Sequence, residues 1–340
     1  MQTDFLAIGD IVTEPFIRLK DARVHCNIND ESCEICMRWG DKIPYDYDVP
    51  MYAVGNASNA AVAAARLGLG AALRAYIGDD LPGKMCLDKL TEEKVDTSFM
   101  VTEAGKQTNH HYVLWYEAER TILVKHEAFT YTVPESAPPA WVYLSSLADN
   151  SLPYHVALAA WLKEHPDTKL AFQPGTFQMK LGKDALKDIY AHTEVFVCNK
   201  AEAERILEVE PTLGHSSATG EADDKKKLLT SLQALGPKIV VITDDRKGAY
   251  AADTAGHFYY IPMYPDVREP KERTGAGDAF ASTVVAALAL GKPLEEALLW
   301  GPINSMSVVQ EVGAQQGLLT RAQLEQYLTD APANYKLESL

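Results

Sequence analysis

The sequence is short of basic residues, of cysteine and of long apolar runs. Lys and Arg number 32 against 47 Asp and Glu, and the formal charge of −15 argues against nucleic acid or an anionic membrane as a partner. The apolar stretches are interrupted well short of a membrane span. Residues 1–5 lack the basic region and cleavage site of a signal peptide. We therefore expect a cytoplasmic protein that holds any phosphate-bearing ligand with local donors.

Cysteine is scarce, and its spacing fits no complete metal site. Cys33-x-x-Cys36 follows His25-Cys26, which invites a zinc interpretation, but no second Cys or His pair completes it locally. If residues 33–36 form a strand, Cys33 and Cys36 point to opposite faces, which also disfavours joint ligation. The total of five cysteines is odd, and in a cytoplasmic chain this favours reduced thiols.

What the chain does contain is a regular alternation of strands and helices. Residues 5–12 are typical of a buried strand. Further strands are expected at 142–147, 170–172, 195–198 and 239–243, with helices at 154–164 and 184–190. This rhythm predicts right-handed βαβ units in an α/β fold, with a doubly wound, mostly parallel sheet flanked by helices. We assign residues 1–340 to a single domain of this kind.

Two polar segments differ from this core. Residues 16–50 and about 106–127 alternate polar and apolar positions and carry charges, and the second segment is split at 117–119 as in a hairpin. This pattern is typical of antiparallel strands with one face in water. Because the two segments share a pattern that the core lacks, we predict that they join in one small antiparallel β lid inserted in the α/β core.

The most informative stretch is 274–280, a Gly-rich turn that runs into an Ala-rich helix. Gly275, Ala276 and Gly277 leave the amides at the helix start unobstructed, and a helix N-terminus is a ready anion site. Asp278 follows in the first turn. Here a carboxylate would take a proton from an attacking hydroxyl while the amides hold a phosphoryl group. The alternative is an ordinary acidic residue at a helix start.

Asn residues at two other expected helix starts also allow two interpretations. Asn59 lies in the first turns of a helix of small residues, where it would either hold a substrate hydroxyl or make a capping interaction. Asn199 and Glu202 follow the strand 195–198, at the end where ligands of open α/β sheets bind. They fit either a nucleotide with a metal-bound water or a helix cap.

Taken together and in this order, the pieces resemble the PfkB family of carbohydrate kinases, which have the ribokinase-like fold. The stretch 274–280 is close to the C-terminal signature of the family, residues 54–59 are similar to its N-terminal Gly-Gly motif, and 199–202 match its Asn-x-x-Glu element. The resemblance covers nearly the whole chain. It implies transfer of the γ-phosphoryl group of ATP to a hydroxyl of a sugar such as ribose or fructose, with a nucleoside as the alternative acceptor.

The resemblance also implies roles for individual residues. Asp278 would be the catalytic base, and Glu202 would organise Mg²⁺ through water. The remaining assignments are Gly275, Ala276 and Gly277 around the transferring phosphoryl group, Glu14, Gly55 and Asn59 on the acceptor, and Asn199, Thr243, Gly248 and Asn304 on the nucleotide. The lid would exclude water and form the interface of a homodimer.

The chain departs from the family pattern at several positions. Glu14 stands where many members have Asp, and Asp245 takes a position near the phosphates that is usually Gly. Glu272 and Arg273 replace the usual Asp-Thr, which argues against a family-type monovalent-cation site. A rival from a different class is an inactive regulator that binds a sugar or a nucleotide. The retained Asp278 argues against that rival.

Overall fold

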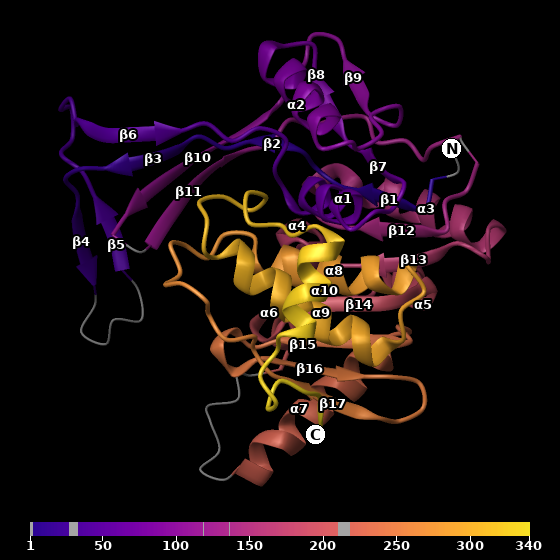
Figure 1. Ribbon diagram of the computed structural model, residues 1–340. Helices are drawn as coiled ribbons and strands as arrows, with labels where there is room; N and C mark the ends of the chain where they lie inside the picture. Colours follow the sequence, from indigo (N-terminus) through magenta and orange to yellow (C-terminus); the bar gives the residue numbers. More distant parts are fainter. Residues whose placement is uncertain (1–2, 27–32, 118, 136, 210–217) are drawn as a thin grey trace.

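A mostly parallel sheet forms the centre of the molecule. The computed structural model describes residues 3–26, 33–117, 119–135, 137–209 and 218–340, and within them the central sheet has the order β18-β17-β16-β15-β14-β13-β12-β1-β7 (Figure 1). The parallel strands are β1 (Phe5–Ile8), β7 (Ala71–Arg74), β12 (Trp141–Leu144), β13 (Lys169–Phe172), β14 (Thr193–Asn199) and β15 (Ile239–Thr243). The antiparallel edge consists of β16 (Ala249–Ala252), β17 (Phe258–Ile261) and β18 (Glu338–Ser339). The predicted fold class is confirmed.

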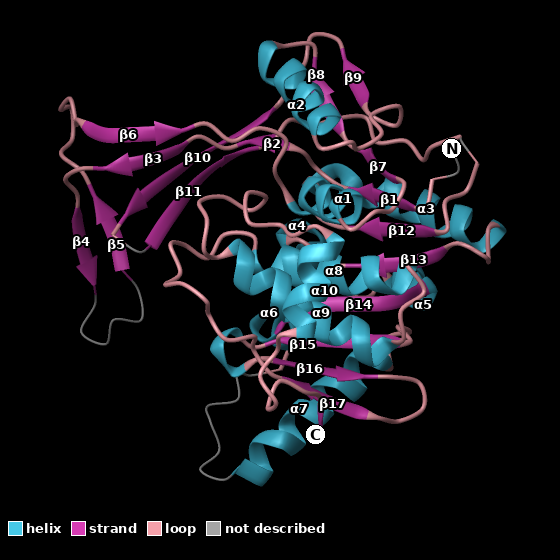
Figure 2. Ribbon diagram, viewed as in Figure 1, coloured by secondary structure: helices cyan, strands magenta, loops and turns pink. Residues whose placement is uncertain are grey.

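Helices cover both faces of this sheet, because side chains alternate between the faces along each buried strand. In β1, Phe5 and Ala7 belong to one core, whereas Leu6 and Ile8 belong to the other. The first core is covered by α1 (Asn56–Arg66), α8 (Ala276–Ala289), α9 (Leu294–Val308) and α10 (Arg321–Thr329), and the second by α3 (Leu152–Glu164), α5 (Lys187–His192), α6 (Lys200–Leu207) and α7 (Ala218–Gln233) (Figure 2). None of the helices in the described ranges is long and apolar enough to cross a membrane.

The carboxyl ends of the parallel strands meet at one edge of the sheet, where ligands of such folds bind. Asp10 follows β1, Gln173 follows β13, and Asn199 ends β14. The N-terminus of α8 lies at the same edge, because Asp278 in its first turn contacts Gln173. Smaller elements complete the fold, namely α2 (Leu81–Glu92), α4 (Thr176–Leu181) and the strand pair β8 (Tyr76–Gly78) and β9 (Val101–Glu103).

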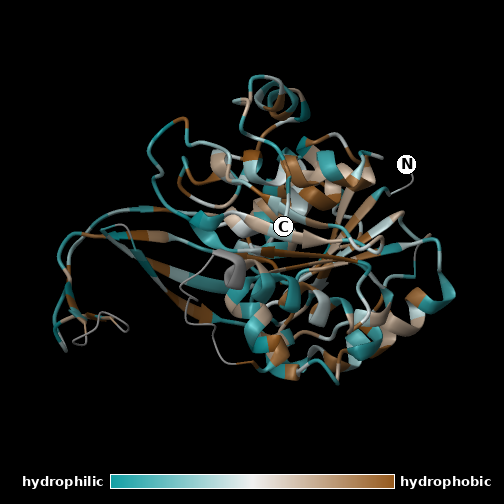
Figure 3. Cartoon of the chain, turned by 90° about the horizontal axis from the view of Figure 1, so that it is seen from below, coloured by the Kyte–Doolittle hydropathy of each residue, from teal (hydrophilic) through white to brown (hydrophobic). Residues whose placement is uncertain are grey.

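The two segments predicted to form a lid share a second sheet. Its order is β11 (Glu119–Lys125), β10 (Asn109–Tyr116), β3 (Phe16–Leu19) and β6 (Tyr45–Val49), with β2 (Val12–Thr13) beside β10. The pairs β10–β11 and β3–β6 are antiparallel as predicted, whereas β10 runs parallel to β2 and β3. Figure 3 shows this sheet, which we call the lid, reaching out from the body. Residues 27–32 and 118 of the predicted lid lie outside the described residues.

A hairpin of β4 (Arg23–Cys26) and β5 (Cys33–Cys36) extends the lid and corrects one prediction. Cys26 and Cys33 form a disulfide, so the expectation of reduced thiols is wrong for these two residues. The physical reason is that they lie directly opposite each other in the antiparallel ladder, with Cα atoms 4.0 Å apart. Cys36 is an exposed free thiol at the end of β5.

Candidate active site

The first turn of α8 depends on a glycine and on a buried carboxylate. Gly275 precedes the helix with φ +78°, and a Cβ there would lie 2.4 Å from the Cβ of Ala314, so no other residue fits without rearrangement. The Glu272 carboxylate accepts hydrogen bonds from the amides of Thr274 (2.7 Å) and Gly313 (2.8 Å). Glu272, which departs from the family pattern, therefore ties this turn to the loop that follows α9.

Asp278 is held by donors from two distant parts of the chain. Asn59 Nδ2 donates to Asp278 Oδ2 at 2.8 Å, and Gln173 Nε2 donates to Oδ1 at 3.1 Å. Each donor is itself oriented, because Gln315 Nε2 donates to Asn59 Oδ1 (3.0 Å) and the Tyr143 hydroxyl donates to Gln173 Oε1. Asn59 makes no side-chain cap on α1, so the capping alternative does not apply to it. Asn59 instead orients the candidate base.

The pKa of Asp278 is raised above its ordinary value. Burial is the main cause, the hydrogen bonds from Asn59 and Gln173 oppose it, and the nearby Glu14 carboxylate raises the pKa further. A carboxylate with a raised pKa is a stronger base, and the two donors keep its oxygens in a fixed orientation.

Replacement of Gln173 by methionine should shift the pH dependence of activity. The carboxylate of Asp278 loses one of the two hydrogen bonds that stabilise its charge, so its pKa should rise. Because the base must be ionised, the acidic limb of the pH profile of kcat/KM should move to higher pH, and rates on that limb should fall roughly tenfold. Initial rates across the pH range test this. A limb that stays in place, or moves to lower pH, would contradict the assigned contact.

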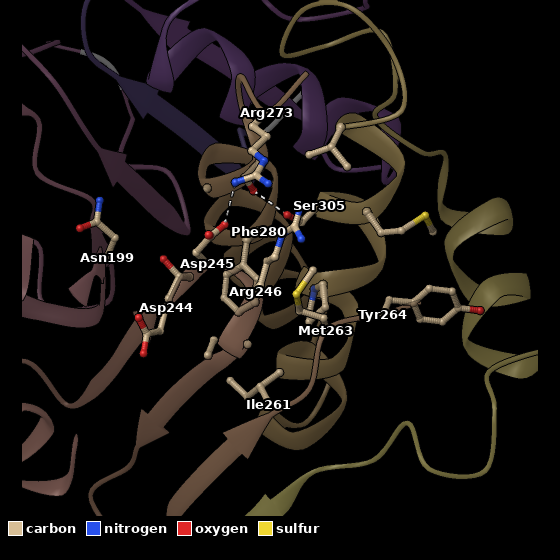
Figure 4. A pocket seen from close by; sticks show the side chains of 18 of the residues that line it. Asn199, Asp244, Asp245, Arg246, Ile261, Met263, Tyr264, Arg273, Phe280 and Ser305 are labelled. Carbon is tan, nitrogen blue, oxygen red and sulfur yellow. Dashed lines mark hydrogen bonds and ion pairs between the residues drawn. The ribbon is translucent and has the colours of Figure 1, made fainter. Parts of the chain in front are cut away.

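A pocket of about 560 Å³ opens beside the N-terminus of α8. Asn199, Thr243 and Gly248, three of the four residues assigned to the nucleotide, line it. Figure 4 shows Asn199 at one side of this pocket and apolar side chains such as Ile261 farther along its wall. A polar end and an apolar wall suit a molecule that carries phosphates at one end and an aromatic base at the other.

Of the three residues whose amides are assigned to a phosphoryl group, two line this pocket and Gly275 does not. Ala276 and Gly277 line it, and both belong to the first turn of α8, where amides have no acceptor one turn earlier in the helix. A Cβ built on Gly277 meets nothing within 4 Å, so the space beside this residue is open. The hydroxyl of Thr274 is buried and has no partner in the described structure. The amide of Ala276 makes only a long bond of 3.4 Å to Arg273.

The loop after β15 explains how an aspartate replaces the usual glycine. Asp245 has φ +47°, a left-handed conformation that Asp tolerates better than most residues. Its carboxylate lies 3.6 Å from Arg273 Nη1, and Figure 4 shows the two side chains pointing toward each other. Gly248 has φ +84°, and a Cβ there would lie 2.4 Å from the carbonyl oxygen of Ile261. Asp245 therefore lines the pocket and forms an exposed ion pair with Arg273 there.

Asn199 and Glu202 form the capping box that was the alternative interpretation. Asn199 Oδ1 accepts from the Glu202 amide, and Glu202 Oε2 accepts from the Asn199 amide, each at 2.8 Å. Burial raises the pKa of Glu202, the bond from the Asn199 amide opposes this, and the Asp278 carboxylate raises the pKa further. Glu202 is thus close enough to Asp278 for the two charges to interact.

Of the residues predicted to bind the acceptor, Asn59 contacts Asp278 and Glu14 lies near it. Glu14 sits between β2 and β3 and interacts electrostatically with Asp278. Its Oε1 lies 2.8 Å from His111 Nδ1. Gly55 has φ +110°, and a Cβ there would lie 2.9 Å from the carbonyl oxygen of Asp10. Glu14 is thus joined to β10, and Gly55 packs against the loop after β1.

Comparison with known proteins decides the family. The chain matches the pfkB family of carbohydrate kinases over residues 26–321. It belongs to this family. It is 27% identical over 282 residues to a ribokinase of Bacillus subtilis (strain 168), which covers 81% of this chain and 87% of that protein. It is 29% identical over 243 residues to a fructokinase of Klebsiella pneumoniae, covering 69% and 76%. The structure of Arabidopsis thaliana ribokinase complexed with ribose and ATP has the same fold, with a TM-score of 0.78, 17% identity and coverage of 96% and 99%.

In this pfkB kinase, the structure does not bring Asn304 into the pocket. Asn304 is fully buried in α9, donates to Thr283 Oγ1 (2.7 Å) and accepts from the Leu319 amide (2.9 Å). The helix turns other residues, including Ser305 and Met306, toward the pocket instead. Asn304 therefore has a structural role here, because all that the structure shows of its side chain is bonding within the core.

A magnesium ion would find only part of its ligand shell in this pfkB kinase. In the described ranges, no group of three or more His, Cys, Asp or Glu side chains could hold a metal ion. Mg²⁺ keeps several waters and often binds one carboxylate together with substrate phosphates. Glu202 fits this mode, since its carboxylate uses one oxygen in the capping box and lies near Asp278.

Sequence reasoning missed several residues of the site. Gln173 follows β13 at the carboxyl edge of the sheet, and this position was the one signal that could have identified it. Gln315, His111 and His126 had no such signal, because they reach the site from elements far away in the chain.

Proposed function

We propose that the protein transfers the γ-phosphoryl group of ATP to a hydroxyl group of a sugar of the ribose or fructose type. The observation that carries the proposal is the position of Asp278. Its carboxylate is fixed by two donors at the start of α8, next in sequence to Gly277, which lines the pocket, and close enough to Glu14 for their charges to interact. A base between a nucleotide pocket and polar acceptor groups is the arrangement that phosphoryl transfer to a hydroxyl requires.

In the proposed reaction, Asp278 accepts the proton of the attacking hydroxyl as its oxygen bonds to the γ-phosphorus. The bond between that phosphorus and the bridging oxygen breaks, and ADP leaves with the electron pair. The amides of Gly275, Ala276 and Gly277 stabilise the charge on the transferring group. Glu202 would hold Mg²⁺ through water, and the ion would supply neutralisation of the phosphate charge.

The choice of sugar is supported by the relatives and by the acceptor side of the site. The two relatives described above are named as a ribokinase and a fructokinase, and the structure with the same fold contains ribose and ATP. Glu14 and Asp278 offer carboxylate oxygens, which accept hydrogen bonds from sugar hydroxyls.

The test is a panel of acceptors assayed for ADP release. Ribose, fructose, other neutral sugars and nucleosides are each mixed with ATP, Mg²⁺ and the protein. We expect a sugar to stimulate ADP release strongly and the nucleosides to stimulate it weakly. If only nucleosides stimulated ADP release, the acceptor would be a nucleoside and not a sugar. A protein that binds ATP but releases no ADP with any acceptor would indicate the inactive regulator instead.

We also propose that the protein forms a homodimer through the lid. Large apolar side chains are exposed on this sheet, namely Tyr45, Tyr47, Tyr112, Ile122, Leu123 and Val124. Neighbouring exposed apolar side chains of this size are typical of an interaction surface.

A charged double substitution in β11 should give a monomer. Leu123 and Val124 are 52% and 58% exposed and point to opposite faces of the strand, so changing both to glutamate introduces charge whichever face makes the interface. Sedimentation should show a dimer for the wild type and a monomer for this variant. Val156→Glu is the matched control, because Val156 is 60% exposed on α3, outside the lid. If the wild type sediments as a monomer, the proposed homodimer is wrong.

A further inference from the structure

Two histidines connect two carboxylates in a row at the base of the lid. Glu14 Oε1 lies 2.8 Å from His111 Nδ1, His111 Nε2 lies 3.2 Å from His126 Nε2, and His126 Nδ1 lies 3.2 Å from Asp10 Oδ2. The side chains are between 5% and 15% exposed. His111 is on β10 and His126 directly follows β11, whereas Asp10 and Glu14 flank β2. The row therefore joins the lid hairpin to the segment that carries the acceptor carboxylate.

His111 is held at both of its ring nitrogens. Its Nδ1 faces Glu14 Oε1, a carboxylate oxygen that accepts, so Nδ1 donates in that contact. The two Nε2 atoms of His111 and His126 lie 3.2 Å apart, so one donates and the other accepts. The orientation of the His111 ring toward Glu14 is therefore fixed.

Neighbouring groups hold the far end of the row in place. The hydroxyl of Tyr131 donates to Asp10 Oδ1 at 2.8 Å, and the ring of Phe177 packs edge-on against His126 with centroids 5.5 Å apart. Asp10 Oδ2 and His126 Nδ1 are both buried and lie 3.2 Å apart, but neither makes a hydrogen bond in the described structure. The contacts with Phe177 and His111 therefore hold His126 in place.

We infer that His111 and His126 are positioning residues for Glu14 and that they restrict the acceptor to uncharged polyhydroxyl compounds. His111 occupies Glu14 Oε1, and in the described structure no group donates to Oε2, which is left for a hydroxyl of the acceptor. The carboxylates of Glu14 and Asp278 interact with each other on the acceptor side. Two neighbouring carboxylates repel sugar acids and sugar phosphates. The acceptor part of this inference depends on the proposed function, but the positioning of Glu14 does not.

Replacement of His111 by asparagine tests the positioning role. Asparagine is shorter than histidine and loses the link to His126, so Glu14 is no longer held in one orientation. The KM for the acceptor should rise about tenfold or more, while kcat changes less than about threefold and the KM for ATP stays constant. His110→Asn is the matched control, because His110 contacts Thr13 at 2.6 Å in place of the row. An unchanged acceptor KM, or an equal rise in the control, would overturn the role.

Two further measurements complete the test. In protein with nitrogen-15-labelled histidine and no substrate, nuclear magnetic resonance should show that Nδ1 of His111 carries a hydrogen, with assignment from the His111→Asn spectrum. A His111 Nδ1 without a hydrogen would overturn the positioning role, whichever acceptor the enzyme uses. The sugar acid with the same chain length as the accepted sugar should not be phosphorylated. Equal use of the acid would overturn the restriction.

Discussion

The variant Asp278→Asn is expected to lose turnover by roughly 10²-fold or more while it keeps its fold and its affinity for ATP. Asparagine has the same shape but cannot accept the proton of the attacking hydroxyl. The nucleotide pocket should be unaffected, because Asp278 is not among the side chains that line it. The folded state should change little in stability, since loss of a partly buried charge offsets the loss of one hydrogen bond to Asn59 or Gln173.

Three measurements on the same preparation separate chemistry from folding and binding. Steady-state rates give turnover, calorimetric titration gives the affinity for ATP, and a melting curve gives stability. Asn59→Asp is a useful companion, because it would place a second carboxylate against Asp278 and should impair both stability and rate. Turnover of Asp278→Asn close to that of the wild type would contradict the assignment of the base.

The variant Gly275→Ala should be the most damaging single change at the start of α8. Its Cβ would lie 2.4 Å from Ala314 Cβ and 2.6 Å from Ala314 Cα, and the residue would keep a φ of +78°. The backbone strain and the steric overlap together should lower the free energy of unfolding by about 2–4 kcal/mol. Activity should fall as well, because the amides that hold the phosphoryl group shift with the turn.

Gly277→Ala, two residues later, is the matched control. A Cβ at Gly277 meets no atom within 4 Å, and alanine in a first helical turn should leave stability unchanged or slightly higher. Its methyl group would project where the phosphoryl group is expected, so turnover should fall roughly tenfold or more. Urea denaturation and initial rates therefore separate the two glycines. Equal loss of stability in both variants would contradict this account of the turn.

The fold was predictable because its signals are local. The apolar strands and the helices between them repeat along the chain, and the apolar composition of each strand predicts that it is buried. The lid was predictable as a pattern, but its pairing was not. Whether β10 lies beside β3, and in which direction, depends on where the core places each segment, and no residue within either segment reports that.

The site was predictable only where its residues lie in one short stretch. Asp278 and its glycines are neighbours, and Asn199 and Glu202 share one helix turn. Gln173 contacts Asp278 from 105 positions away, and single residues at such distances leave no pattern in one sequence. Asn304 was assigned to the nucleotide but lies outside the pocket. Its helix was expected, but the packing of α8 against α9 buries the face on which it lies.

The most direct test of the central claim is a phosphorus-31 spectrum of the products. ATP, Mg²⁺ and the acceptor panel are incubated with the wild type and, in parallel, with Asp278→Asn. The account predicts ADP together with a new phosphomonoester of a neutral sugar for the wild type, and almost none of that ester for the variant. Formation of the ester by the variant at the wild-type rate, or release of inorganic phosphate without any ester by the wild type, would contradict it.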